Sequence, residues 1–217
     1  MTIIDEYKAV LFDVDGVLLD SMPQHVDAWV RAGQELGLLI DEEEVYRREG
    51  EKPEKSAKDF IKNAGLMSTR ARAQALIDKK IEIFKTNVRT PKVFPGAMTA
   101  LEILRDAGMK LAFVTGTSRH EINKIMPPDM AECFAASVCG DEILHGKPNP
   151  EPYMAAMAQL GVSGKESLVI ENAPYGIQSG RAAGATVWAL RSYLSDADLS
   201  DAHRIIDLME DFAALLK

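Results

Sequence analysis

The stretch that organises this chain is AVLFDVDG, at residues 9–16. Its first four residues form a continuous apolar run rather than an alternating one. Such a run is typical of a strand buried on both faces, as in a parallel sheet covered by helices. Similar runs follow at residues 111–114, 168–170 and 186–190, and a weaker one at 135–139. The sequence therefore predicts a buried parallel sheet.

Helical patterns separate these strands. Apolar residues recur at helical spacing over residues 97–107, 149–160 and 173–183, and each segment is followed by a glycine, a common end of a helix. Strands that alternate with helices in this way indicate an α/β fold, a doubly wound parallel sheet.

The region after the first strand is different, because no strand pattern interrupts it. It predicts helices at residues 24–37, 41–48, 55–64 and 68–86. We therefore expect two domains: an α/β catalytic core at residues 1–18 and 92–217, and an inserted helical cap domain at residues 19–91.

Composition narrows the class of protein. The chain has 217 residues, is 47% hydrophobic and carries a net charge of −8. This length allows one good core and a second small one. The negative net charge argues against binding to nucleic acid or to an anionic membrane. It also means that an anionic substrate must be held by locally concentrated positive charge.

Cys133 and Cys139 fit neither a disulfide scaffold nor a zinc motif. Residues 1–8 lack an apolar signal core, and we expect a cytoplasmic monomer.

Polar residues follow each predicted strand. Asp13 and Asp15 follow the first, Thr115, Gly116 and Thr117 the second, and Glu171 and Asn172 a later one, while Lys147 lies between these last two clusters. Ligands of open parallel sheets bind at the carboxyl ends of the strands, so these groups should converge.

The set has a chemical logic. A carboxylate can attack phosphorus, and a hard cation such as Mg²⁺ removes its repulsion from a phosphate dianion. Thr115 and the amide of Gly116 can hold phosphate oxygens, and Lys147 adds a point charge. Gly16 allows a turn that swings Asp15 over the site, where Asp15 can move the proton.

Four segments together resemble the motifs of the haloacid dehalogenase-like (HAD) hydrolase superfamily. They read DVDGVLLDS at residues 13–21, VTG at 114–116, GKPNPEP at 146–152 and VIENAPYGI at 169–177. They are most similar to the β-phosphoglucomutase and phosphoglycolate phosphatase-like enzymes. The resemblance implies a HAD-like Rossmannoid core, Asp13 as nucleophile and metal ligand, and Asp15 as acid/base that also binds metal through its carbonyl. It places Glu171 and Asn172 at the metal.

The cap carries further candidates. His25 and Lys80 match cap residues of the mutase type, where the histidine contacts the site on closure; a surface histidine and a solvated lysine are the alternatives. Glu49 precedes Gly50 in a loop that can reach the site, or is a plain surface acid. The mutase has an arginine where this chain has Pro53, which counts against mutase activity.

Asn172 is the most informative departure from the family, because a second acid is usual there. A neutral ligand weakens metal binding unless Glu171 or Glu49 compensates, and it leaves the site more positive. The variant ENAP at residues 171–174, together with the Glu49-Gly50 loop, resembles the motifs of bacterial HAD-type inorganic pyrophosphatases.

The sequence thus predicts a magnesium-dependent phosphatase whose substrate is a small phosphorylated metabolite or pyrophosphate. The alternatives are a sugar phosphomutase and a non-catalytic phosphate-binding relative. Dehalogenation would leave Asp15 and the cluster of Glu171 and Asn172 without a purpose.

Overall fold

The computed structural model describes residues 3–87 and 90–216. Six parallel strands form the central sheet, in the order β5-β4-β1-β6-β7-β8. Their bounds are β1 Ala9–Phe12, β4 Lys110–Val114, β5 Ala136–Val138, β6 Ser167–Glu171, β7 Thr186–Leu190 and β8 Arg204–Ile206. The predicted parallel sheet is confirmed, and its four main strands lie where the apolar runs placed them.

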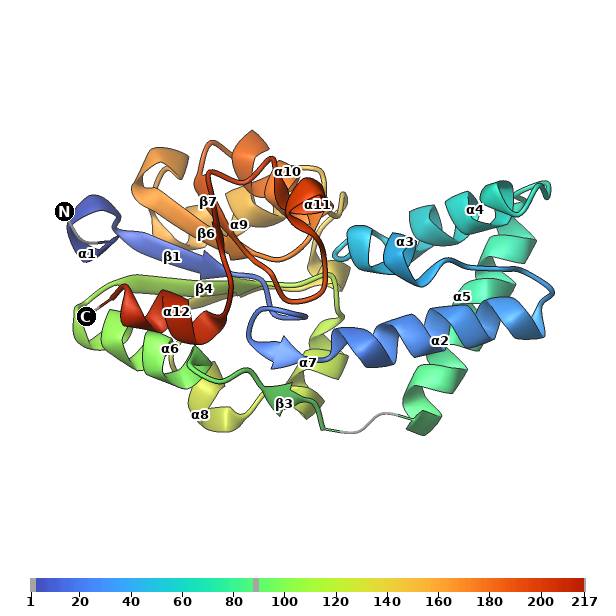
Figure 1. Cartoon of the computed structure of the whole chain (residues 1–217), viewed down its shortest axis with the longest axis horizontal. Helices are drawn as coiled ribbons and strands as arrows, with labels where there is room; N and C mark the ends of the chain where they lie inside the picture. Colours follow the sequence, from blue (N-terminus) through green and yellow to red (C-terminus); the bar gives the residue numbers. More distant parts are fainter. Residues whose placement is uncertain (1–2, 88–89, 217) are drawn as a thin grey trace.

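Helices cover both faces of the sheet (Figure 1). One layer contains α6 (Ala97–Asp106), α7 (Arg119–Ile125), α8 (Pro128–Ala131) and α12 (Met209–Ala214). The other contains α9 (Glu151–Leu160), α10 (Pro174–Ala182) and α11 (Asp196–Leu199). Short elements complete the core: α1 (Ile3–Glu6) and the 3₁₀ turns η1 (Gly140–Glu142) and η2 (Gly164–Glu166). The doubly wound α/β fold is therefore confirmed.

The side chains of β1 show why the apolar run is continuous. Val10 and Phe12 pack in the core cluster between the sheet and helices α6 and α12, whereas Ala9 and Leu11 pack in the cluster on the opposite face. All four residues are fully buried. Because successive strand residues point to opposite faces, only an apolar residue at every position suits a sheet covered on both sides.

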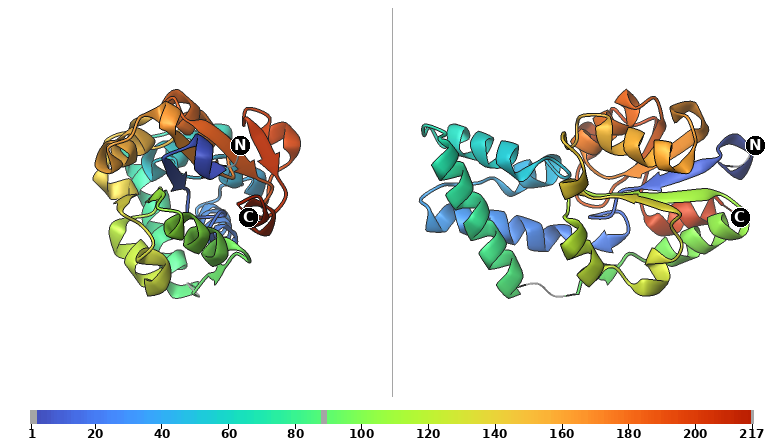
Figure 2. Two further views of the ribbon diagram at one scale, coloured as in Figure 1. Left: turned by 90° about the vertical axis from the view of Figure 1, so that its left-hand side faces the viewer. Right: turned by 180° about the vertical axis from the view of Figure 1, so that it is seen from behind.

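The cap is a separate layer of four helices at one end of the molecule, away from α1 (Figures 1 and 2). Its helices are α2 (Met22–Glu35), α3 (Glu42–Arg47), α4 (Pro53–Asn63) and α5 (Arg70–Asn87). Trp29, Phe60 and Leu76 belong to its own apolar cluster. A two-stranded antiparallel ribbon, β2 (Leu19–Asp20) with β3 (Lys92–Val93), lies where the chain passes between core and cap. The exact domain limits at residues 18/19 and 91/92 stay a prediction.

The register of the sheet positions the site. Phe12 pairs with Phe113 on one side and with Ile170 on the other. The next residue, Asp13, donates its backbone N–H to the carbonyl of Ile170 at 3.0 Å. The ends of three strands therefore lie side by side at the edge of the sheet that faces the cap.

Within the described ranges, no helix is both long and apolar enough to cross a bilayer.

Candidate active site

Asp13 and Lys147 form the centre of the site. The ammonium of Lys147 donates to Asp13 Oδ1 at 2.5 Å and to Glu171 Oε1 at 2.7 Å, and lies 3.9 Å from Glu49 Oε2. All four side chains are buried. Burial would lower the pKa of Lys147, but the surrounding carboxylates, Asp13 first, outweigh it and raise the pKa well above its usual value. The lysine is therefore charged.

Asp15 faces a ring of hydroxyl groups. Ser21 donates to its Oδ1 at 2.5 Å, and Thr115 and Thr117 donate to its Oδ2 at 2.8 and 3.0 Å. Burial would raise the pKa of Asp15, but the adjacent imidazole of His25 and these hydroxyls hold it below its ordinary value. Gly16, at φ 97°, makes the turn that the sequence predicted. Asp15 therefore points away from Asp13's lysine and toward the cap.

Thr115, Gly116 and Thr117 lie together after β4, as expected. The Thr115 hydroxyl also accepts the backbone N–H of Thr117 at 3.0 Å. A Cβ on Gly116 would lie 2.7 Å from the Cα of Gly50, so this position admits only glycine while the cap loop is seated. The turn thus borders both the reaction centre and the cap.

Glu171 uses its carboxylate within the protein. Its Oε1 accepts from Lys147 and from the hydroxyl of Tyr153, the latter at 2.6 Å. Its Oε2 accepts the backbone N–H of Asn172 at 2.9 Å. In this arrangement Glu171 orients Lys147, and its part in metal binding stays a prediction. Sequence reasoning missed Tyr153, because a tyrosine in an apolar helix pattern is indistinguishable from ordinary core.

Several buried oxygens at the centre have no hydrogen-bond partner among the described residues: Asp13 Oδ2, Glu49 Oε2 and Asn172 Oδ1. Asp13, Glu49 and Glu171 also bring ligand atoms within 4.8 Å of one another. Three carboxylates face a single lysine here. Burial raises the pKa of Asp13 and of Glu49 well above the usual range, and mutual repulsion adds to it. Unpartnered oxygens and excess negative charge fit a hard divalent cation such as Mg²⁺.

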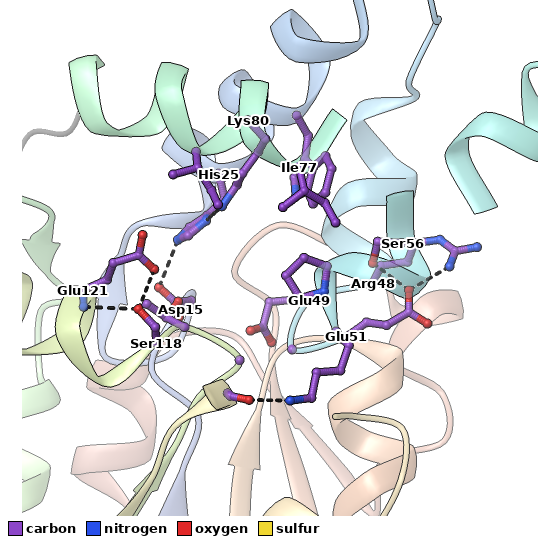
Figure 3. A pocket seen from close by; sticks show the side chains of 18 of the residues that line it. Asp15, His25, Arg48, Glu49, Glu51, Ser56, Ile77, Lys80, Ser118 and Glu121 are labelled. Carbon is purple, nitrogen blue, oxygen red and sulfur yellow. Dashed lines mark hydrogen bonds and ion pairs between the residues drawn. The ribbon is translucent and has the colours of Figure 1, made fainter. Parts of the chain in front are cut away.

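A cavity of about 420 Å³ lies between cap and core, lined among others by Asp15, Glu49 and Thr117. Asp13 and Lys147 are buried just outside this lining. Figure 3 shows His25 and Lys80 extending from cap helices toward Asp15, with Glu49 beside them. His25 Nε2 lies 3.6 Å from Asp15 Oδ1, and its Nδ1 lies 3.3 Å from Lys80 Nζ. His25 also stacks on Phe84, with ring centroids 4.4 Å apart. The structure thus brings the predicted cap residues to the mouth of the site.

Lys80 differs from the solvated lysine that the sequence allowed. Its side chain is half-buried, and desolvation lowers the pKa of its ammonium. Its Nζ lies 4.7 Å from the centroid of the Phe84 ring and 5.8 Å from that of Trp29. An aromatic lining of this kind partly replaces the lost hydration of a cation. Lys80 therefore directs its amino group into the cavity beside His25.

The fold and the site together show buried acids at the carboxyl edge of a parallel sheet beneath a helical cap, and comparison with known proteins gives the family. Residues 7–184 match the haloacid dehalogenase-like hydrolase family. Hexitol phosphatase A of Escherichia coli is 31% identical over 209 residues, which cover 94% of this chain and 92% of that protein. The chain therefore belongs to the haloacid dehalogenase-like hydrolases, and its phosphatase relatives support a phosphate-ester hydrolase.

Two further relatives complete the comparison. The beta-phosphoglucomutase of Bacillus subtilis is 28% identical over 182 residues, covering 82% of this chain and 80% of that protein. A crystal structure of a hydrolase from Pseudomonas syringae superimposes with a TM-score of 0.86 at 24% identity, covering 95% of this chain and 96% of that one. This last likeness concerns the fold alone. The family predicted from the four motifs is confirmed, while the likeness to pyrophosphatases stays a prediction.

Proposed function

We propose that this protein is a magnesium-dependent phosphatase that acts on a small phosphorylated metabolite or on pyrophosphate through an aspartyl-phosphate intermediate. The observation that carries the proposal is the state of Asp13. Lys147 holds one of its carboxylate oxygens, while the other is buried and has no partner among the described residues. A carboxylate that is oriented by a cation and still has a free oxygen suits nucleophilic attack.

The reaction has two displacements. Asp15 is ionised in the described structure, because its hydroxyl partners and His25 lower its pKa, and the negative charge of a bound phosphate group lets it take up a proton from solvent. In the first displacement, an oxygen of Asp13 forms a bond to phosphorus as the bond between phosphorus and the leaving oxygen breaks, and Asp15 gives that proton to the leaving oxygen. In the second, Asp15 takes a proton from water. The water oxygen then bonds to phosphorus, the bond to Asp13 breaks, and phosphate is released. Lys147 and the turn at residues 115–117 hold the phosphoryl oxygens throughout.

Magnesium fits the residues that surround Asp13. Asp13 and Asn172 offer buried, unpartnered oxygens, the family resemblance adds the carbonyl of Asp15, and Glu49 reaches in from the cap. When bound, the ion supplies the positive charge that lets a carboxylate approach a phosphate dianion. Asn172 contributes no charge, so the supply of ligand charge falls partly to Glu49.

The cavity favours a small leaving group. Its volume of about 420 Å³ is near the lower end of the range for small-molecule sites. A phosphorylated metabolite of sugar size fits this space, and the relative named hexitol phosphatase agrees with that size. Pyrophosphate is supported by Asn172, which carries one negative charge fewer than the usual acid, and by Lys80, whose amino group lies in the cavity lining.

A phosphate-release assay tests the proposal. Wild-type protein is incubated with sugar phosphates and pyrophosphate, with Mg²⁺ and with a chelator. We expect release only with Mg²⁺, and its abolition in Asp13→Asn. Asp106→Asn is the matched control, because Asp106 is exposed and lies outside the site. Mass spectrometry should detect phosphate on the peptide that contains Asp13. Undiminished release by Asp13→Asn would contradict the mechanism, and no preference for pyrophosphate would exclude it as the main substrate.

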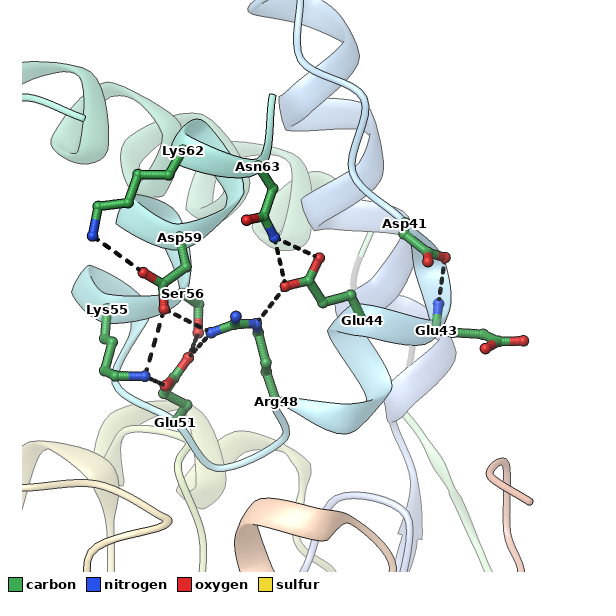
Figure 4. A network of polar contacts seen from close by, with 10 residues as sticks. All are labelled: Asp41, Glu43, Glu44, Arg48, Glu51, Lys55, Ser56, Asp59, Lys62 and Asn63. Carbon is green, nitrogen blue, oxygen red and sulfur yellow. Dashed lines mark hydrogen bonds and ion pairs between the residues drawn. The ribbon is translucent and has the colours of Figure 1, made fainter. Parts of the chain in front are cut away.

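A sugar phosphomutase is the second candidate, since one relative is a beta-phosphoglucomutase. A mutase must hold the distal phosphate of a bisphosphate between cap and core. The cap arginine that lines the cavity, Arg48, is already paired with Glu44, Glu51 and Asp59 (Figure 4). This pairing and Pro53 make the mutase the weaker candidate. Formation of glucose 6-phosphate from β-glucose 1-phosphate, with a catalytic bisphosphate supplied, would reverse that order.

A further inference from the structure

The loop between α3 and α4, residues 48–52, carries Glu49 from the cap into the core. Its last residue, Lys52, connects the loop to the core by hydrogen bonds. The ammonium of Lys52 donates to the carbonyl of Gly140 at 2.6 Å and to that of Ile143 at 2.7 Å. Both carbonyls belong to the segment that leads directly to Lys147. One cap lysine therefore joins the loop of Glu49 to the segment of Lys147.

Glycines allow this loop to pack closely on the core; we call the loop seated when it has this position. A Cβ on Gly146 would lie 3.1 Å from both the Gly50 carbonyl oxygen and the Lys52 nitrogen. Gly50 has φ 74°, and a Cβ there would lie only 2.3 Å from the Cδ of Lys147. Because no side chain intervenes, backbone packs on backbone. The place of Glu49 then depends on whether the loop is seated.

The two carbonyls explain why a lysine suits this position. Gly140 is the first residue of the short 3₁₀ turn η1 and Ile143 follows its end, so the two carbonyls that accept from Lys52 flank the turn. A lysine ammonium satisfies both with charge-assisted hydrogen bonds. On opening, water can replace these bonds at modest cost, so the contact holds the closed cap without making closure irreversible.

The loop makes other contacts with the core: the guanidinium of Arg48 lies 5.8 Å from the centroid of the Tyr175 ring, and Glu49 Oε2 lies 3.9 Å from Lys147 Nζ. Neither of these is a hydrogen bond, unlike the two that Lys52 donates. Two further contacts cross the same interface. The ion pair of Arg47 with Asp198 is more exposed to solvent. Tyr46 stacks on Tyr193, with ring centroids 4.9 Å apart. Both involve residues before the loop, whereas Lys52 closes it on the other side of Glu49.

We propose that Lys52 is a positioning residue that holds Glu49 beside Asp13 while the cap is closed. Its kinetic consequence rests on the proposed function, whereas its effect on the loop does not. Without Lys52, the loop leaves its seat more often, and the buried carboxylate of Glu49 returns to water. Fewer molecules then present Glu49 to the cation at any moment.

Hydrogen–deuterium exchange on the metal-free protein tests the effect on the loop. In Lys52→Met, amides of residues 48–52 and 140–146 should exchange faster, on the order of tenfold, as expected for loss of charge-assisted hydrogen bonds. Lys58→Met is the matched control, because Lys58 is exposed on α4. Lys52→Arg should restore part of the protection. Equal exchange in Lys52→Met and the control would overturn the proposal.

Magnesium titration tests the link to Glu49. With p-nitrophenyl phosphate as the probe, Lys52→Met should need more Mg²⁺ for half-maximal rate, on the order of tenfold, and recover most of its kcat at saturation. Gly146→Ala should behave alike although Lys52 is intact, because the new methyl group pushes the loop from the core side. An unchanged Mg²⁺ requirement in both variants would overturn the link. If wild type releases no phosphate, the proposed function fails, while the exchange experiment still decides the role of Lys52.

Discussion

Replacement of Lys147 by methionine should reveal how much the buried acids depend on one cation. The ammonium is 1% exposed and contacts Asp13 at 2.5 Å and Glu171 at 2.7 Å. Methionine keeps most of the length of the side chain, so packing changes little and the lost charge dominates. Removing one partner of a buried ion pair costs about 3–5 kcal/mol. For a chain of this size, that loss lowers Tm by about 10 °C.

The assay is urea and thermal unfolding of wild type and Lys147→Met, without metal and with Mg²⁺. We expect Mg²⁺ to stabilise the variant more than wild type, because the ion compensates charge that the lysine no longer balances. Lys58→Met, at an exposed site, is the control for loss of a lysine. A loss below about 1 kcal/mol without metal would refute the reasoning. Equal stabilisation of both proteins by Mg²⁺ would refute the link between the lysine and the cation site.

Three further predictions concern other contacts. Tyr153→Phe removes a hydrogen bond to the buried carboxylate of Glu171 and should cost about 1.5–3 kcal/mol in urea unfolding; a cost below about 0.5 kcal/mol would contradict it. Gly176→Ala places a methyl group 1.9 Å from Glu171 Oε1, so phosphate release should fall more than about tenfold, and an unchanged kcat would exclude this role. Hydrogen bonds from Lys8 and Ser163 lower the pKa of Glu166 from 4.5 to about 2. Wild type should therefore exceed Glu166→Gln in urea stability above pH 4.5, and lose that advantage as the pH falls toward 2; a constant difference would argue against the ion pair.

Much of the α/β core domain could be predicted, because the sequence patterns of its strands are local. The run at residues 9–12 is apolar at every position, which only a sheet covered on both faces explains. Polar residues directly after such runs must lie at the carboxyl edge, so the meeting of Asp13, Thr115 and Glu171 followed from their place in the chain. In the structure, Asp13 and Glu171 share the ammonium of Lys147, and Thr115 contacts Asp15.

Short or polar elements escaped prediction. Strand β8, Arg204–Ile206, is a three-residue edge strand that follows a polar stretch, and β2 and β3 have two residues each. Such segments bury too few side chains to show a period, and pairing with a neighbour defines them. Helices α7, α8 and α12 were missed for a similar reason, since each has at most seven residues.

The sequence by itself determined the sheet, the order of the strand-end clusters and the family, because each depends on patterns within a few neighbouring residues. Only the tertiary structure decided how the acids divide their contacts. Whether the carboxylate of Glu171 is available to a metal depends on the hydroxyl of Tyr153, from which it accepts a hydrogen bond. Glu49 is buried near Asp13 in a cap loop whose Lys52 donates to the carbonyl of Gly140, 88 residues away in sequence. Such contacts arise from the packing of distant segments, and residue type alone does not encode which side chains will meet.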